Sequence, residues 1–255
     1  MLLEAHQLTH SIGQRTLYRD LDLTIKEGEA WAILGINGSG KSTLLHTLAG
    51  LIQPTSGKIT LDGKNIGNFS RRLVANRLGI LLQQQNDEFP ITVLETALAG
   101  CQPRLGLWGW ESREDKMQAL DWLDKMGLKG FEQRLTSTLS GGERRRLAIA
   151  TLMMQQPQTA LLDEPDNHLD PARRQQIVKL LAGHFTQQHH SAILSLHDVN
   201  IAKRYCSHIL MLDGHGEWYS GTVTEMLEKE QLEWLYRCSV TIIEGPDGPV
   251  YLPGY

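Results

Sequence analysis

The stretch Gly35-Ile36-Asn37-Gly38-Ser39-Gly40-Lys41-Ser42 fits the pattern G-x-x-x-x-G-K-[ST] of a phosphate-binding loop. An apolar run at residues 30–34 predicts a buried strand before it, and residues 43–49 predict a helix after it. The glycines allow a tight turn in which successive N–H groups point at phosphate oxygens. The helix adds roughly half a positive charge at its N-terminus. An ordinary glycine-rich turn is the alternative, but strand, spacing, Lys-Ser and helix together favour a phosphate site.

Two acids follow the apolar run 159–162, where a second strand of the same sheet would end. Asp163 at the tip of that strand suits a metal bound, directly or through water, beside a triphosphate. Glu164 points elsewhere and could accept a proton from an attacking water. A solvated turn is the alternative for such a pair. With the phosphate loop upstream we expect Lys41 to reach the β- and γ-phosphates and Ser42 to be a further Mg²⁺ ligand.

The segment Leu139-Ser140-Gly141-Gly142-Glu143 opens a predicted helix. Ser140 and Glu143 fit the pattern S-x-x-E of a capping box. A serine cap, two glycines and exposed N–H groups at a helix start also make a second anion site on a separate surface. The following arginines, residues 144–146, are interpreted as a solvated helix face rather than as a ligand site.

Three smaller signals lie near the ends of other predicted strands. Gln83, the first of three glutamines after residues 80–82, could hold Mg²⁺ or the attacking water, although Gln84 and Gln85 leave the choice open. His197, after another apolar run, could hydrogen-bond the γ-phosphate. Asp170 fits the N-cap of a helix that begins at Pro171.

The whole chain has 255 residues, 21% charged residues and a formal net charge of −4, which does not suggest a nucleic-acid partner. Its three cysteines form no C-x-x-C pair, so a reduced cytosolic setting is the simplest expectation. Short strands with turns are expected in residues 1–30 and 57–66. Apolar runs then alternate with helical patterns, which predicts a largely parallel α/β sheet. Residues 88–140 are interpreted as an inserted, mostly helical arm.

Taken in order, these motifs resemble the ATP-binding subunit of an ABC transporter: Walker A, Q-loop (Gln83), signature, Walker B, D-loop (167–170) and H-loop (His197). The resemblance implies an α/β fold: a P-loop NTPase (RecA-like) core with a small antiparallel β subdomain and an inserted helical subdomain. It implies one nucleotide-binding domain over residues 1–255, with a helical subdomain at about 88–140 and a C-terminal extension at 215–255.

The resemblance also implies an ATPase that works as a head-to-tail dimer, with ATP and Mg²⁺ as cofactors. Each ATP would lie between Walker A of one copy and the signature of the other. Glu164, His197 and Gln83 would be catalytic, and Ser42, Gln83 and Asp163 would hold the metal. The nucleotide-binding residues would be Gly35, Asn37, Gly38, Ser39, Gly40, Lys41, Ser42, Thr43, Ser140, Gly141, Gly142, Glu143 and Asp170.

The D-loop, residues 196–206 around the H-loop, and the C-terminal tail are similar to those of importer ATPases for iron–siderophores, haem and cobalamin. This implies an integral membrane permease, a periplasmic binding protein and a second ATPase copy or paralogue as partners, at the cytoplasmic face of the inner membrane. An exporter or lipid-handling complex is one alternative. A soluble ABC protein acting on ribosomes or DNA is another, but the chain has one cassette, no heptad run and no basic excess.

Several positions depart from the family pattern. Ile12 stands where an aromatic residue usually stacks on adenine, so adenine could be held more weakly or by another group. Asp166 replaces Thr or Ser and could raise the pKa of Glu164 or face water. Residues 101–104 lack the Arg-Tyr-Pro-His pattern common in siderophore importers. Trp108 and Trp110 in the helical arm are expected either to pack within it or to contact the permease.

Overall fold

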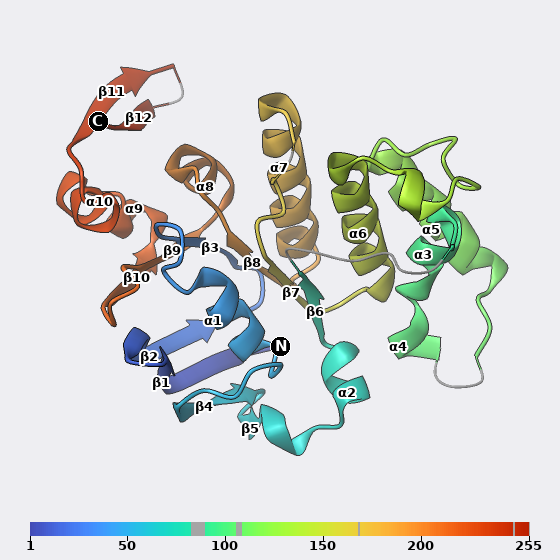
Figure 1. Ribbon diagram of the computed structural model, residues 1–255, viewed down its shortest axis with the longest axis horizontal. Helices are drawn as coiled ribbons and strands as arrows, with labels where there is room; N and C mark the ends of the chain where they lie inside the picture. Colours follow the sequence, from blue (N-terminus) through green and yellow to red (C-terminus); the bar gives the residue numbers. More distant parts are fainter. Residues whose placement is uncertain (83–89, 106–108, 168, 247, 255) are drawn as a thin grey trace.

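The computed structural model describes residues 1–82, 90–105, 109–167, 169–246 and 248–254. The centre of this structure is a six-stranded sheet, shown in Figure 1. Its strands are β3 (Ala30–Leu34), β6 (Leu78–Leu81), β7 (Thr159–Leu162), β8 (Ser191–Ser195), β9 (His208–Leu212) and β10 (Trp218–Thr222). They lie in the order β10-β9-β3-β8-β7-β6, parallel from β9 to β6, with β10 antiparallel at one edge. The carboxyl ends of the parallel strands therefore meet at one edge of the sheet.

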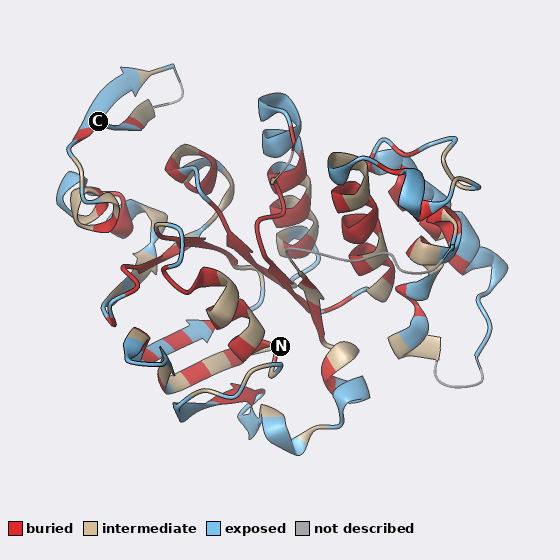
Figure 2. Ribbon diagram, viewed as in Figure 1, coloured by how far each residue is buried: buried red, intermediate tan, exposed pale blue. Residues whose placement is uncertain are grey.

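Both faces of this sheet are covered, which explains why its parallel strands are largely apolar runs. In β3, Trp31 and Ile33 contribute to one hydrophobic cluster, while Ala32 and Leu34 contribute to the other. Figure 2 shows the buried residues concentrated along the sheet and on the helix faces that pack against it. Because every position of β3 is buried, its sequence shows no alternation of polar and apolar residues.

On one face, helix α1 (Lys41–Leu48) lies between the main sheet and a second, antiparallel sheet. That sheet has the order β2-β1-β4-β5 and consists of β1 (Leu3–Ile12), β2 (Arg15–Ile25), β4 (Ser56–Leu61) and β5 (Lys64–Asn65). The expectation of short strands near the N-terminus is wrong in length, because β1 and β2 have 10 and 11 residues. Their long hairpin covers α1, whose buried leucines face both sheets.

The other face is covered by helices α6 (Gly141–Gln155), α7 (Pro171–Gln187) and α8 (Val199–Tyr205). The helical arm expected at about 88–140 packs on α6 through α3 and α5. The remaining elements before α6 are 3₁₀-helix η1 (Ile66–Asn68), α2 (Arg71–Ala75), α3 (Val93–Ala99), α4 (Gln102–Leu105), α5 (Arg113–Lys125) and 3₁₀-helix η2 (Thr136–Thr138).

The C-terminal part of the chain begins with the edge strand of the main sheet and continues into elements outside that sheet. Strand β10 forms the sheet edge, and α9 (Val223–Met226), α10 (Lys229–Tyr236), β11 (Val240–Gly245) and β12 (Gly248–Pro253) follow. The β11–β12 hairpin is joined to α8 because Asn200 and Tyr251 exchange hydrogen bonds of 3.0 and 2.9 Å. Residues 215–255 thus combine the antiparallel edge strand of the main sheet with two helices and a hairpin outside that sheet.

Candidate functional site

The loop between β3 and α1 has the shape that its glycines predict, for two different reasons. Gly38 and Gly40 have φ angles of 76° and 102°, in the left-handed region that favours glycine. Gly35 is required for space instead: a Cβ there would lie 2.4 Å from Ser39 Oγ and 2.6 Å from the Leu212 carbonyl oxygen. The loop therefore turns tightly against the end of β9 and leads directly into α1.

Lys41, the first residue of α1, is buried in this loop. Its Nζ donates hydrogen bonds to the carbonyl oxygens of Gly35 at 2.7 Å and Ile36 at 3.2 Å. Burial lowers the pKa of this ammonium, and the nearby carboxylates of Glu164 and Asp163 oppose that shift. The loop thus holds a cation at its centre, close to the two predicted acids.

A cavity of about 660 Å³ brings the predicted residues together from separate parts of the chain. The phosphate loop and the start of α1 form one wall, and the segments after β7 and β8 form another. Its lining residues are Ile12, Arg15, Leu17, Asn37, Gly38, Gly40, Lys41, Ser42, Thr43, Glu164, Asn167 and His197. Gly35 and Ser39 belong to the same loop but do not line the cavity, and both are buried.

Asp163 is fully buried directly after β7, and one of its two carboxylate oxygens has no hydrogen-bond donor among the described residues. Its Oδ1 accepts a hydrogen bond of 2.7 Å from the Ser195 hydroxyl at the end of β8. Its Oδ2 is buried and finds no hydrogen-bond partner among the described residues. A buried carboxylate oxygen without a donor fits a hard divalent cation such as Mg²⁺, with the Ser42 hydroxyl as a second oxygen ligand. Gln83, the third predicted ligand, lies outside the described residues.

Glu164 is held in the cavity by contacts to both of its carboxylate oxygens. Oε1 lies 2.9 Å from His197 Nε2, and Oε2 accepts a hydrogen bond of 2.9 Å from Asn167 Nδ2. Its backbone has a φ of 47°, which is strained for a residue other than glycine. The Glu164 N–H donates to Ser195 Oγ at 2.7 Å. Ser195, which the sequence analysis did not single out, therefore contacts both acids.

Asp166 does not face water, so that alternative is wrong. Its side chain is buried, and burial raises the pKa of its carboxyl group. Arg174 and His197 lie close enough to oppose that shift. The residue is therefore buried close to His197, although it does not line the cavity itself.

The signature segment forms the capping box that its sequence predicts. The Glu143 N–H donates to Ser140 Oγ at 3.3 Å, and the Ser140 N–H donates to Glu143 Oε2 at 2.8 Å. These bonds lower the pKa of the Glu143 carboxyl group. Ser140 and Gly141 are exposed, and no residue of the segment lines the cavity of the phosphate loop. The start of α6 is thus a separate surface.

The interpretation of residues 144–146 as a solvated face is wrong for Arg145 and Arg146, which are both buried. Arg145 donates to the backbone carbonyls of Leu82, Asp163 and Glu164. The sequence did contain a signal: Arg145 lies four residues before the buried Ile149, on the same helix face.

The other residues that the sequence analysis singled out lie at different places in the structure. Asp170 caps α7 by accepting from the Arg173 N–H at 3.1 Å, as predicted; its contact with nucleotide stays a prediction. Ile12 is 60% exposed at the rim of the cavity, and Trp110 is 88% exposed before α5. Trp108 and His168 lie outside the described residues.

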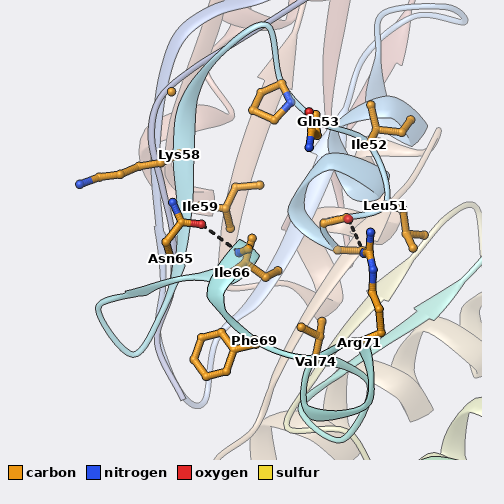
Figure 3. Close-up of a pocket in the computed structure, with 15 residues that line it drawn as sticks. Leu51, Ile52, Gln53, Lys58, Ile59, Asn65, Ile66, Phe69, Arg71 and Val74 are labelled. Atoms are coloured by element: carbon orange, nitrogen blue, oxygen red, sulfur yellow. Dashed lines mark hydrogen bonds between the residues drawn. The ribbon is translucent and has the colours of Figure 1, made fainter.

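A second cavity, of about 510 Å³, lies between the end of α1, the β4–β5 hairpin and α2 (Figure 3). Two of its polar side chains are engaged locally: Arg71 donates to the Gly50 carbonyl at 2.6 Å, and Asn65 accepts from the Gly67 N–H at 2.9 Å. None of the described residues that line it is a carboxylate or a histidine. Within the part of the chain that the structure describes, this second cavity therefore lacks the carboxylate and the histidine that line the first one.

Comparison with known proteins identifies a family model described as ABC transporter, which matches residues 18–167. The petrobactin import ATP-binding protein FpuC of Bacillus anthracis is 32% identical over 99% of this chain and 93% of its own length. The ferric enterobactin transport ATP-binding protein FepC of Escherichia coli K12 is 34% identical over 96% and 90%. A phosphonates import ATP-binding protein of Alcaligenes faecalis is 34% identical over 86% and 83%.

Solved structures give the same picture. A metal-chelate type ABC transporter in an inward-facing conformation has a TM-score of 0.83, covering 99% of this chain and 97% of that one; at 24% identity this likeness shows the fold. The ATP-binding cassette MJ0796, a dimer in a post-hydrolysis state bound to ADP and Pi, is 27% identical with a TM-score of 0.76, covering 87% and 98%.

Proposed function

Because this chain belongs to the ABC transporter family and is one of its ATPases, we propose that it powers an importer for an iron–siderophore complex, haem or cobalamin. The relatives include phosphonate and thiamine import proteins. The siderophore relatives cover 96–99% of this chain, whereas the phosphonate relatives cover 86–91% and the thiamine relative 75%. Coverage of nearly the whole chain by the siderophore relatives supports a siderophore-type cargo.

The observation that carries the ATP-driven part of this proposal is the convergence of Lys41, Ser42, Glu164 and His197 on one cavity. Lys41 and the loop N–H groups would bind the β- and γ-phosphates. Ser42, Asp163 and Gln83 would hold Mg²⁺, which neutralises charge that develops on the phosphates.

The remaining residues of the cavity would act on the water and on the γ-phosphate. Glu164 would take a proton from the attacking water, since its carboxylate is fixed between His197 and Asn167. His197 would donate a hydrogen bond to the γ-phosphate. These side chains come from three separate segments of the chain, so folding of the sheet assembles the site.

We propose further that two copies, or one copy and a paralogue, form a head-to-tail dimer. The exposed N–H groups at the start of α6 lie away from the cavity of their own chain, so they would contact ATP held by the other copy. Ser140, Gly141, Gly142, Glu143 and Asp170 would belong to that contact. ATP that binds only the closed dimer would shift the population toward it, and hydrolysis would release it.

The proposed partners are an integral membrane permease and a periplasmic binding protein, with this chain peripheral at the cytoplasmic face of the inner membrane. No helix among the described residues is long and apolar enough to cross a membrane. Trp110, in the helical arm, would contact the permease, because an indole ring that is 88% exposed offers a large apolar surface.

The proposed role in transport is tested by identifying the proteins that bind to this chain. Affinity-tagged Glu164→Gln protein, extracted from membranes in mild detergent with ATP, is expected to bring down a polytopic membrane protein, whose type would narrow the cargo. The wild-type chain with ADP serves as the control. Recovery of soluble partners alone, such as ribosomal proteins, would contradict the importer proposal.

Adenine is proposed to lie at the rim formed by Ile12 and Arg15. Both residues line the cavity beside the phosphate loop, and the Arg15 Nε donates to the Gly214 carbonyl at 2.9 Å. The guanidinium plane can stack on a base, as an aromatic ring would.

Replacing Ile12 by tyrosine is expected to tighten ATP binding about fivefold to a hundredfold, because stacking of a base on an aromatic ring contributes roughly 1–3 kcal/mol. Calorimetric titration of ATP measures the change. Ile12→Leu is the matched control and is expected to leave the affinity within about twofold. Equal affinities of Ile12→Tyr and Ile12→Leu would place adenine elsewhere.

A further inference from the structure

Arg145 joins three backbone positions at the edge of the sheet where the site lies. Its side chain is 7% exposed and comes from the second turn of α6. One Nη group donates to the carbonyl of Leu82, directly after β6, and the other to the carbonyls of Asp163 and Glu164, directly after β7. A planar guanidinium presents donors in a fixed fork, so it fixes these carbonyls relative to one another.

The Glu164 backbone needs such support because it is strained. With a φ of 47°, Glu164 occupies a conformation that persists only where its surroundings enforce it. Ser195 Oγ accepts from its N–H at 2.7 Å, while its carbonyl accepts from Arg145 Nη2 at 3.0 Å and from the Asn167 N–H at 3.1 Å. Both sides of the residue are thus held, and Arg145 supplies a side-chain hydrogen bond to its carbonyl.

Arg145 also belongs to the helix that starts with the signature. Ser140 caps α6, and Arg145 follows five residues later on the same helix. The start of α6 is therefore linked to the carbonyls of Leu82, Asp163 and Glu164 through one buried guanidinium group. The surface that would contact one ATP is joined in this way to the acid that would act on the other.

We propose that Arg145 is a positioning residue that holds the Glu164 carboxylate and the end of β6 at a fixed place relative to the signature helix. This inference rests on the proposed function, because it assigns Arg145 an effect on turnover through Glu164. It predicts that Arg145 affects kcat and leaves nucleotide affinity unchanged, because no Arg145 atom lines the cavity.

The test compares Arg145→Met with the control Gln155→Met in the full-length chain. Gln155 lies on the same helix and donates to the carbonyls of Ala75 at 2.6 Å and Leu78 at 3.0 Å, near the start of β6 and far from the site. Arg145→Met is expected to lower the kcat of ATP hydrolysis at least tenfold, with KM and ATP affinity within twofold. Gln155→Met is expected to lower the thermal unfolding midpoint while kcat stays within twofold.

Arg145→Lys keeps the charge and one donor group and is expected to restore part of the lost kcat. If Arg145→Met does not fold, Arg145→Lys carries the test, with an expected kcat between that of the wild type and one tenth of it. The inference would be overturned if folded Arg145→Met had the wild-type kcat, or if it lost kcat and ATP affinity in parallel. Glu164→Gln is measured alongside. If it turns over normally, the proposed base role fails; if it is inactive while Arg145→Met is active, only the role of Arg145 fails.

Discussion

Replacing Glu164 by glutamine is expected to lower the kcat of ATP hydrolysis by about 10²–10⁴-fold, the usual contribution of a general base. Glutamine has the shape of glutamate and can keep both neighbours, with its oxygen toward Asn167 Nδ2 and its amide toward His197 Nε2. It cannot take a proton from water. Steady-state phosphate release gives kcat, and a separate titration of ATP is expected to show near-wild-type affinity.

The same variant is expected to accumulate as an ATP-bound dimer, because the step that ends the closed state is lost. Light scattering after size-exclusion chromatography, with and without ATP, measures this. Glu164→Asp is the matched control: it keeps a carboxylate but moves it one methylene away from His197, so part of the turnover and less dimer are expected. Wild-type turnover in Glu164→Gln would remove Glu164 from the base role.

The features that the sequence predicted correctly depend on residues close together in the chain. The tight turn that leads into α1, the capping box of Ser140 and the helix that begins at Pro171 are each specified within a few positions. The apolar runs predicted the strands of the main sheet because both faces of that sheet are covered. The comparisons confirm the family and the P-loop fold class that these motifs indicated.

The features that it missed depend on partners far apart in the chain. Arg145 contacts Leu82, 63 residues away, and Ser195 contacts Asp163, 32 residues away. Charge alone suggested a solvated position for Arg145, whereas the carbonyls at two strand ends provide acceptors for a buried guanidinium. No local pattern indicates which strand ends become neighbours, since the sheet order sets this.

Replacing Lys41 by alanine is expected to weaken ATP binding by about 10- to 100-fold, the range expected when a charge-assisted hydrogen bond of roughly 1.5–3 kcal/mol is lost. Lys41 is buried at the centre of the loop that lines the cavity. Its cation also lies close enough to Asp163 and Glu164 to interact with them electrostatically. Titrations of ATP, ADP and AMP measure the effect, which we expect to be largest for ATP and smallest for AMP.

The order of the affinity losses for ATP, ADP and AMP distinguishes phosphate binding by Lys41 from a purely structural role. Lys41 Nζ also donates to the carbonyls of Gly35 and Ile36, so Lys41→Ala removes two bonds that hold the loop. A collapsed loop would weaken all three nucleotides alike, whereas a missing cation weakens binding in proportion to the phosphate charge nearby. Lys41→Arg keeps the charge and is expected to retain more ATP affinity than Lys41→Ala. Equal losses for ATP and AMP, or unchanged ATP binding, would contradict the assignment of Lys41 to the phosphates.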